Sequence, residues 1–165
     1  MPADTFLEFK GKNAFEGEST DAKFPRCIEI ISFQIGMTNA GSGATGGGSG
    51  VNKVSFDDIT IQKYVDKSSP NFMMCCANGA HIDKAFIHVR KAGENPQKYL
   101  TITMEEVFIS SFSVGGGDGQ GLPVDHIGLN FSKIEFKYSP QNKDGSLGAA
   151  NPKGWDLKAS QPYAA

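Results

Sequence analysis

Residues 63–79 read Lys-Tyr-Val-Asp-Lys-Ser-Ser-Pro-Asn-Phe-Met-Met-Cys-Cys-Ala-Asn-Gly and carry both a start and a stop signal for a helix. Ser69 can cap free backbone N–H groups, and Pro70 suits the first helical position. Gly79 can adopt the left-handed conformation that ends a helix. The stretch therefore predicts one short helix, over about residues 69–79. The segments around it have the alternation typical of strands, so the chain is expected to be mainly β.

The longest predicted strand begins at Lys98 and ends at Val114. Apolar and polar side chains alternate along it, so one face is expected to be buried. A straight strand of this length would exceed the width of a small domain, which predicts a bend over residues 106–110. The alternation changes phase at residues 132–133 and at residues 57–58, which predicts a bulge at each place. Such slips suit a curved, barrel-like sheet.

Two further predicted strands are apolar on both faces. They lie at Phe6 to Phe9 and at Arg26 to Gly36. A strand of this kind is expected to be covered on both sides. Apolar side chains that one core cannot accommodate are candidates for contacts between subunits, although scattered exposed apolar residues are also normal.

Length and charge limit the remaining possibilities. The 165 residues suit a single domain, and 16 basic against 18 acidic residues give a net charge of −2, without the basic surface of a nucleic-acid binder. A Gly-rich loop is expected over residues 38–52 and a polar tail from about residue 139. The N-terminus has no signal-peptide pattern, and no apolar run is long enough for a membrane span, so folding in the cytoplasm is expected.

No motif in the chain predicts catalysis or a cofactor. The pattern Gly41-Ser-Gly-Ala-Thr-Gly46 matches a dinucleotide fingerprint by letter, but more glycines follow it in place of a helix. The three cysteines, Cys27, Cys75 and Cys76, are expected to be buried thiols, because two are neighbours and the number is odd. A metal site at Cys75, Cys76 and His81 lacks the usual ligand gap. A reactive Cys75 or Cys76 stays open.

Many short elements match one known family in order and spacing. They are the predicted helix, Arg90-Lys-Ala-Gly93, the strand from Leu100 to Val114, Phe6, Gly17-Glu-Ser19, the Gly-rich stretch after Met37, Val124 to Tyr138, and Gly154-Trp-Asp-Leu157. Together they resemble the haemolysin-coregulated protein (Hcp) family, the tube-forming subunit of bacterial type VI secretion systems. The resemblance implies a compact β-barrel of two antiparallel sheets flanked by one short α-helix, in a single domain over residues 1–165.

The resemblance also implies a function. Six copies would close into a ring, rings would stack into a tube, and effector proteins would travel in the lumen, with a contractile sheath and a spike as further partners. In the family a polar position of the strand at residues 26–36 faces the channel; Gln34 matches it, and Ser32 lies on the same face. The matching family loop takes part in ring stacking, which here points to Gly41, Gly43, Gly46, Gly47, Gly48 and Gly50. The protein would be made in the bacterial cytoplasm and then secreted, with no enzymatic activity.

Two alternatives from other classes stay open. A monomeric β-barrel that binds carbohydrate or peptide would share this composition and would need an exposed groove lined by aromatic side chains. A cysteine-dependent enzyme using Cys75 or Cys76 is disfavoured because no Cys–His arrangement accompanies either thiol.

Overall fold

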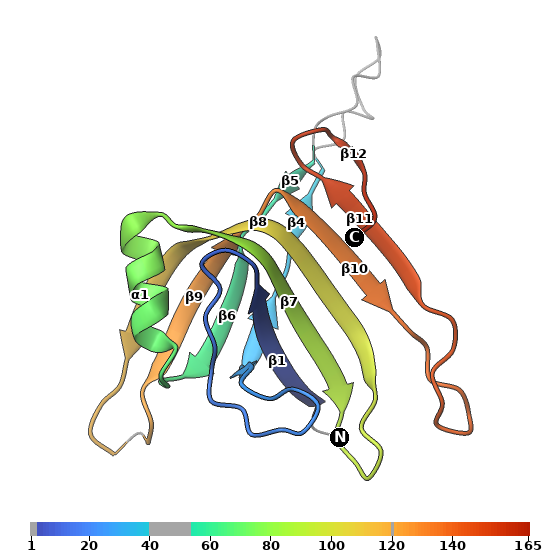
Figure 1. Ribbon diagram of the computed structural model, residues 1–165, viewed down its shortest axis with the longest axis horizontal. Helices are drawn as coiled ribbons and strands as arrows, with labels where there is room; N and C mark the ends of the chain where they lie inside the picture. Colours follow the sequence, from blue (N-terminus) through green and yellow to red (C-terminus); the bar gives the residue numbers. More distant parts are fainter. Residues whose placement is uncertain (1–2, 40–53, 120) are drawn as a thin grey trace.

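The computed structural model describes residues 3–39, 54–119 and 121–165. Strands dominate it, in one ten-stranded and one two-stranded antiparallel sheet, with a single helix among the described residues (Figure 1). The predicted mainly β class is therefore confirmed. The elements in chain order are β1 (Ala3–Lys10), β2 (Ile28–Glu29), β3 (Ser32–Gln34), β4 (Met37–Thr38), β5 (Ser55–Phe56), β6 (Ile59–Tyr64), α1 (Ser69–Asn78), β7 (His81–Lys91), β8 (Lys98–Gly115), β9 (Val124–Asn130), β10 (Lys133–Tyr138), β11 (Asn151–Asp156) and β12 (Gln161–Pro162).

The long strand β8 joins the two halves of the larger sheet. Its first part pairs with β7 on one side and with β10 on the other, whereas its second part, residues 108–115, pairs with β9. Glu106, between the two parts, has a φ of 53°, and near the start of the second part the register shifts between Ile109 and Ser111. The predicted bend is thus confirmed, because a left-handed residue and a bulge redirect the strand there. β9 and β10 follow one another along β8, so the bulge predicted at residues 132–133 is instead a break between two strands, at residues 131–132.

The barrel implied by the family resemblance is not formed, because the larger sheet does not close on itself. Its hydrogen-bonded path runs β12-β11-β10-β8-β7-β1-β2, with β9, β6 and β3 branching from β8. The predicted single strand over residues 26–36 is instead two short strands. Between them the Ile30 N–H donates to the Thr5 carbonyl and the Ile31 N–H donates to the Gln62 carbonyl. At this point the chain passes from pairing with β1 to pairing with β6. It therefore links the two halves of the sheet at the end away from β8, where no single strand belongs to both.

Helix α1 begins at Ser69 as predicted, but its N-cap residue lies one position earlier than its signals suggested. Ser68, not Ser69, occupies the N-cap position, and no side-chain hydrogen bond caps the helix. Gly79 ends the helix with a φ of 67°, as predicted. Phe72 is fully buried and Cys75 nearly so, so this face of the helix packs onto the core. In Figure 1, α1 lies beside β8 and β9 at one side of the sheet.

The apolar second face of β1 is covered within the subunit. The segment 11–27 folds over it, so that Phe24 stacks on Phe6 at 4.7 Å between ring centroids, and both are buried with Cys27. Arg90 lies over both rings and forms ion pairs with Asp4 and Asp21. The expectation that these apolar residues serve contacts between subunits was wrong for Phe6 and Cys27, because a loop of the same chain buries them.

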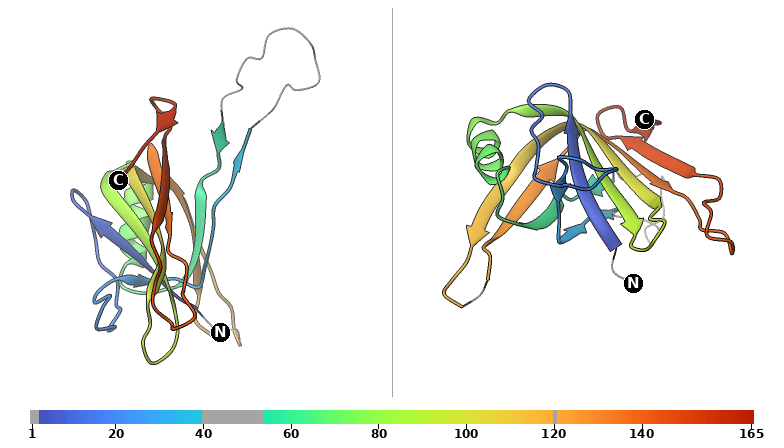
Figure 2. Two further views of the ribbon diagram at one scale, coloured as in Figure 1. Left: turned by 90° about the vertical axis from the view of Figure 1, so that its right-hand side faces the viewer. Right: turned by 60° about the horizontal axis from the view of Figure 1, so that its bottom comes forward.

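Two peripheral regions complete the fold. β4 and β5 pair as a short arm that projects beyond the larger sheet (Figure 2). The segment after Tyr138 includes β11 and β12, which extend the sheet from β10. The polar tail predicted from about residue 139 therefore contains two strands. No described helix is long and apolar enough to span a membrane.

Candidate functional site: a polar sheet face

Four neighbouring strands, β3, β6, β9 and β8, present a continuous polar face. Cross-strand pairs align its side chains in two rows across the sheet. One row holds Ser32, Gln62, His126 and Ser113, and the other holds Gln34, Thr60, Gly128 and Ser111. Alternation on each strand explains the arrangement, because Ile59, Ile61, Ile127 and Leu129 point to the opposite side and are buried.

The face is hollowed into a shallow depression of about 350 Å³. Gly128 lies between Thr60 and Ser111 in the second row: a Cβ atom at this position would lie 2.5 Å from the Ser111 hydroxyl and 2.7 Å from that of Ser110. A side chain larger than hydrogen would therefore displace both serines. The bulge in β8 places these two consecutive serines beside one glycine, and so the hydroxyl groups crowd onto the backbone of β9.

The polar side chains that line the depression are hydroxyls, amides and one imidazole, without a carboxylate, ammonium or guanidinium among them. The titratable side chain in the depression is His126. Asp58 lies at the border, where its carboxylate accepts a hydrogen bond of 2.8 Å from Asn130. A surface of this composition holds another molecule by hydrogen bonds and water bridges, with little dependence on the sign of its charge.

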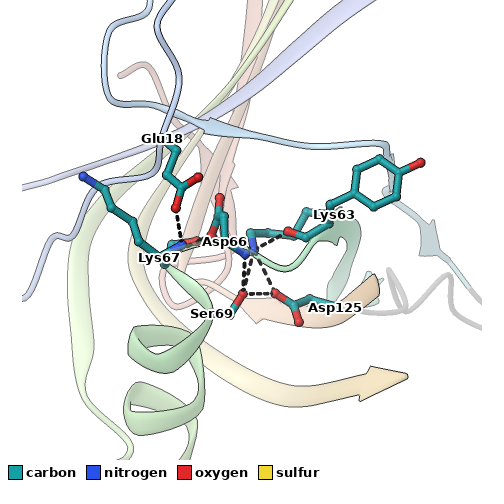
Figure 3. Close-up of polar contacts among 8 residues, drawn as sticks. Glu18, Lys63, Asp66, Lys67, Ser69 and Asp125 are labelled. Atoms are coloured by element: carbon teal, nitrogen blue, oxygen red, sulfur yellow. Dashed lines mark hydrogen bonds and ion pairs between the residues drawn. The ribbon is translucent and has the colours of Figure 1, made fainter. Parts of the chain in front are cut away.

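Beneath the face, the same strands carry a buried ionic network (Figure 3). The Lys63 ammonium lies 2.8 Å from Asp125 Oδ2 and 3.0 Å from Asp66 Oδ1, and both Lys63 and Asp125 are fully buried. The Lys63 ammonium also donates to the Ser69 hydroxyl at 3.1 Å and to the Tyr64 carbonyl at 2.9 Å. Ser69 donates in turn to Asp125. The network joins β6, β9 and the first turn of α1.

The structure places both residues predicted for the lumen on this face. Ser32 and Gln34 are exposed and lie on β3, at one edge of it. Sequence reasoning did not identify the face's other polar members, Thr60, Gln62, Ser111, Ser113 and His126. The alternation of Ile59, Ile61 and Lys63 with Thr60 and Gln62 was a usable signal. The predicted stacking glycines at 41, 43, 46, 47, 48 and 50 lie outside the described residues.

The cysteines form no disulfide among the described residues, and Cys27 and Cys75 are buried. Burial, and then a hydrogen bond to the Glu8 carboxylate, raise the pKa of the Cys27 thiol to about 12. Burial also raises the pKa of Cys75. Both thiols are therefore poor nucleophiles at neutral pH. Within the described ranges no group of three or more His, Cys, Asp or Glu side chains is arranged to hold a metal ion.

Comparisons with known proteins point in one direction. The family model described as "Type VI secretion system effector, Hcp" matches residues 6–138. The protein Hcp1 of Pseudomonas aeruginosa is 38% identical over 160 residues, which is 96% of this chain and 97% of that protein.

Solved structures share the fold of this chain. A type six secretion system protein superposes with a TM-score of 0.89 at 22% identity, covering 98% of this chain and all of the other. Hcp1 of Salmonella typhimurium superposes with a TM-score of 0.79 at 29% identity, covering 99% of this chain and all of the other.

Proposed function

The chain belongs to the Hcp family of type VI secretion proteins, and we propose that it is a tube subunit whose polar face lines a channel for effector proteins. Members of this family are secreted by the type VI system. The observation that carries the proposal is the uncharged polar face on β3, β6, β9 and β8. A conduit must hold a passing protein weakly and then release it, which hydroxyl and amide groups allow and fixed charges or large apolar surfaces do not.

The edges of this four-stranded sheet support a ring. β3 pairs with β6 alone, and residues 109–115 of β8 pair with β9 alone, so each end of the face has an unpaired strand edge within the described residues. Unpaired edges are templates for pairing with another chain. A contact between two different edges of identical subunits is head-to-tail, and it closes into a ring when the rotation divides a full turn. Six copies, as the family resemblance implies, would then make one continuous inner sheet.

In this proposal the Gly-rich loop at residues 38–52 contacts the next ring when rings stack into a tube. Its support is the length and composition of the loop, which exceed what a connection between two strands requires. The tube would be assembled in the cytoplasm, pushed out by a contractile sheath behind a spike, and released with its effectors. The role is mechanical and assigns no catalytic residue.

The test uses assembly and cargo together. Electron microscopy and native mass spectrometry of the purified protein should show closed rings with an open centre. Gln34→Arg should keep the ring but reduce the amount of effector that co-purifies, because it places charge and bulk on the channel wall. Asn95→Arg adds the same charge on an exposed loop and should leave effector recovery unchanged. A monomer at micromolar concentration, or equal effector recovery in both variants, would contradict the proposal.

One observation favours a second candidate, the monomeric binding module. A groove of about 840 Å³ between the β4–β5 arm and β10–β11 is lined by Phe56, Phe136 and Trp155 together with aliphatic side chains. Met37 and Phe136 are exposed there. An aromatic groove of this kind suits a sugar or a peptide. Sizing of the purified protein separates the candidates, since a binding module would elute as a monomer and a tube subunit as a ring.

A further inference from the structure

Helix α1 has two apolar faces. One packs on the core through Phe72 and Cys75. The other, which we call the outer stripe, is exposed and consists of Pro70, Met73, Met74 and Ala77. Met73 and Met74, at its centre, are 52% and 55% exposed, and no residue of α1 is charged. A helix that is apolar on all sides is normally covered on all sides, so the outer stripe is expected to have a partner.

The groove between the β4–β5 arm and β10–β11, which we call the aromatic groove, has the matching character. On its sheet side, Phe136 of β10 lies opposite Lys153 of β11, and Trp155 lies two residues further along β11. On its arm side, Met37 lies opposite Phe56. Lys153 is the only charged side chain among the described residues that line it. The aromatic groove is therefore a mainly apolar surface that the described part of its own chain leaves open.

The outer stripe and the aromatic groove lie at opposite sides of the molecule, so one copy cannot fill its own groove (Figure 1). Each lies beside one of the two strand edges that are unpaired within the described residues. Helix α1 packs against β8, whose residues 109–115 form one of these edges. The arm begins at β4, directly after β3, which forms the other edge. When the two edges of neighbouring copies meet, the outer stripe of one copy approaches the aromatic groove of the next.

We propose that the outer stripe of α1 docks in the aromatic groove of the next copy of this chain. The inference rests on the proposed ring and names two surfaces that close it. A helix bound in a groove is anchored by side chains three, four and seven positions apart, which is the spacing of Pro70, Met73, Met74 and Ala77. The flexible methionine side chains can fill an irregular groove, and their sulfur atoms make favourable contacts with aromatic rings.

The charges of the two surfaces also match. The carbonyl end of a helix carries a partial negative charge, and the last turn of α1 has no basic residue to offset it. Lys153 in the aromatic groove can supply the positive charge. A second copy also explains both surfaces at once, whereas an unrelated peptide in the aromatic groove would leave the outer stripe uncovered.

The experiment follows assembly of the full chain by native mass spectrometry. Met73→Lys/Met74→Lys places charge on the outer stripe, and Phe136→Lys places charge in the aromatic groove. Each variant should be monomeric with an unfolding temperature close to that of wild type, because the changed side chains are exposed. Asn95→Lys adds the same charge on an exposed loop and should keep the ring. In an equal mixture of the first two variants, one intact stripe can meet one intact groove, so a heterodimer should form and grow no further.

Crosslinking provides a second measurement. In a Cys76→Ser background, Met74→Cys/Lys153→Cys treated with a bismaleimide should give a ladder of joined subunits on a denaturing gel, and Met74→Cys/Asn95→Cys should not. A ring in either lysine variant, a mixture that stays monomeric, or the absence of the ladder would overturn the inference. With wild type still a ring, these results would leave the proposed tube function standing. A monomeric wild type would instead contradict the tube function itself.

Discussion

Two neighbouring cross-strand pairs of β6 and β9 face opposite sides of the same sheet. Lys63 and Asp125 point inward, are fully buried and lie 2.8 Å apart. Gln62 and His126 point outward and are exposed. Charge is thus placed where it is paired and enclosed, while the outward face at Gln62 and His126 is polar and uncharged. One residue of register separates this buried pair from the pair on the face that we propose lines the channel, which is why the two pairs should respond oppositely to substitution.

The largest effect is expected from the inner pair. Asp125→Ala should reduce the free energy of unfolding by about 3 to 5 kcal/mol, because it leaves the Lys63 ammonium buried with its main partner removed. Urea unfolding of wild type and variant measures the difference.

The control for this prediction is the double variant Lys63→Met/Asp125→Leu. It removes both charges and fills the space with apolar atoms, so it should lose less stability than Asp125→Ala alone. A double variant that is less stable than the single one would show that hydrogen bonds from Ser69, and not the uncompensated charge, dominate the network.

The inner pair also shows what the sequence alone could predict. Helix α1 was predictable because Pro70 and Gly79 act through local backbone geometry. The burial of Lys63 was not, because its partner Asp125 is 62 residues away along the chain and a lone lysine in a strand is ordinarily exposed. The turn of segment 11–27 over Phe6 was hidden for the same reason: its partners meet only in the folded chain.

The polar face could be predicted from the sequence only in part. The apolar–polar alternation of β6 already placed Thr60 and Gln62 on one face. Their alignment with Ser32 and Ser113 depends on strand order and on the bulge in β8, which alternation does not specify. β11 and β12 were missed because Gly and Pro interrupt the segment that forms them.

The second prediction compares two histidines, one buried and one exposed. The folded-state pKa of His88 is about 4, below an unfolded value of about 6.5, so the unfolded chain binds more protons between these pH values. The free energy of unfolding should keep its whole contribution from neutral His88 above about pH 6.5. It should fall by about 2 to 3 kcal/mol as the pH drops toward 4. His88→Gln should flatten this part of the pH profile of urea unfolding.

The matched control is His126→Gln, on the polar face. His126 is exposed. This substitution should therefore leave the slope of unfolding free energy against pH as in wild type, over the same window of about pH 4 to 6.5. Equal slopes in all three proteins would mean that His88 does not govern the acid sensitivity of the fold.

The third prediction concerns Gly128 on the polar face. Gly128→Ala should lower the free energy of unfolding by about 1 kcal/mol, since the new Cβ lies within 2.7 Å of the hydroxyls of Ser110 and Ser111. In a Ser110→Ala/Ser111→Ala background the same substitution should have a smaller effect, because both crowding oxygens are gone. Thermal unfolding of the four proteins measures the coupling. Additive losses would indicate that backbone strain, not the hydroxyl contacts, requires glycine.

Substitution in the outer pair, Gln62 and His126, should have the smallest effect on stability. Its effect on effector binding should be larger than its effect on stability. Gln62→Ala removes an exposed side chain that packs against nothing in the core, so the free energy of unfolding should change by less than about 0.5 kcal/mol. The same change removes an amide from the centre of the polar face, beside Ser32 and His126. Effector recovery with purified rings should therefore fall, and it should be equally insensitive to salt in wild type and variant, because the lost contacts are neutral hydrogen bonds.

Lys67→Ala, which truncates an exposed side chain elsewhere on the surface, provides the control and should alter neither quantity. If Gln62→Ala instead destabilised the fold as much as Gly128→Ala, the outward face would share the structural role of the inward one, and the contrast between the two pairs would not hold.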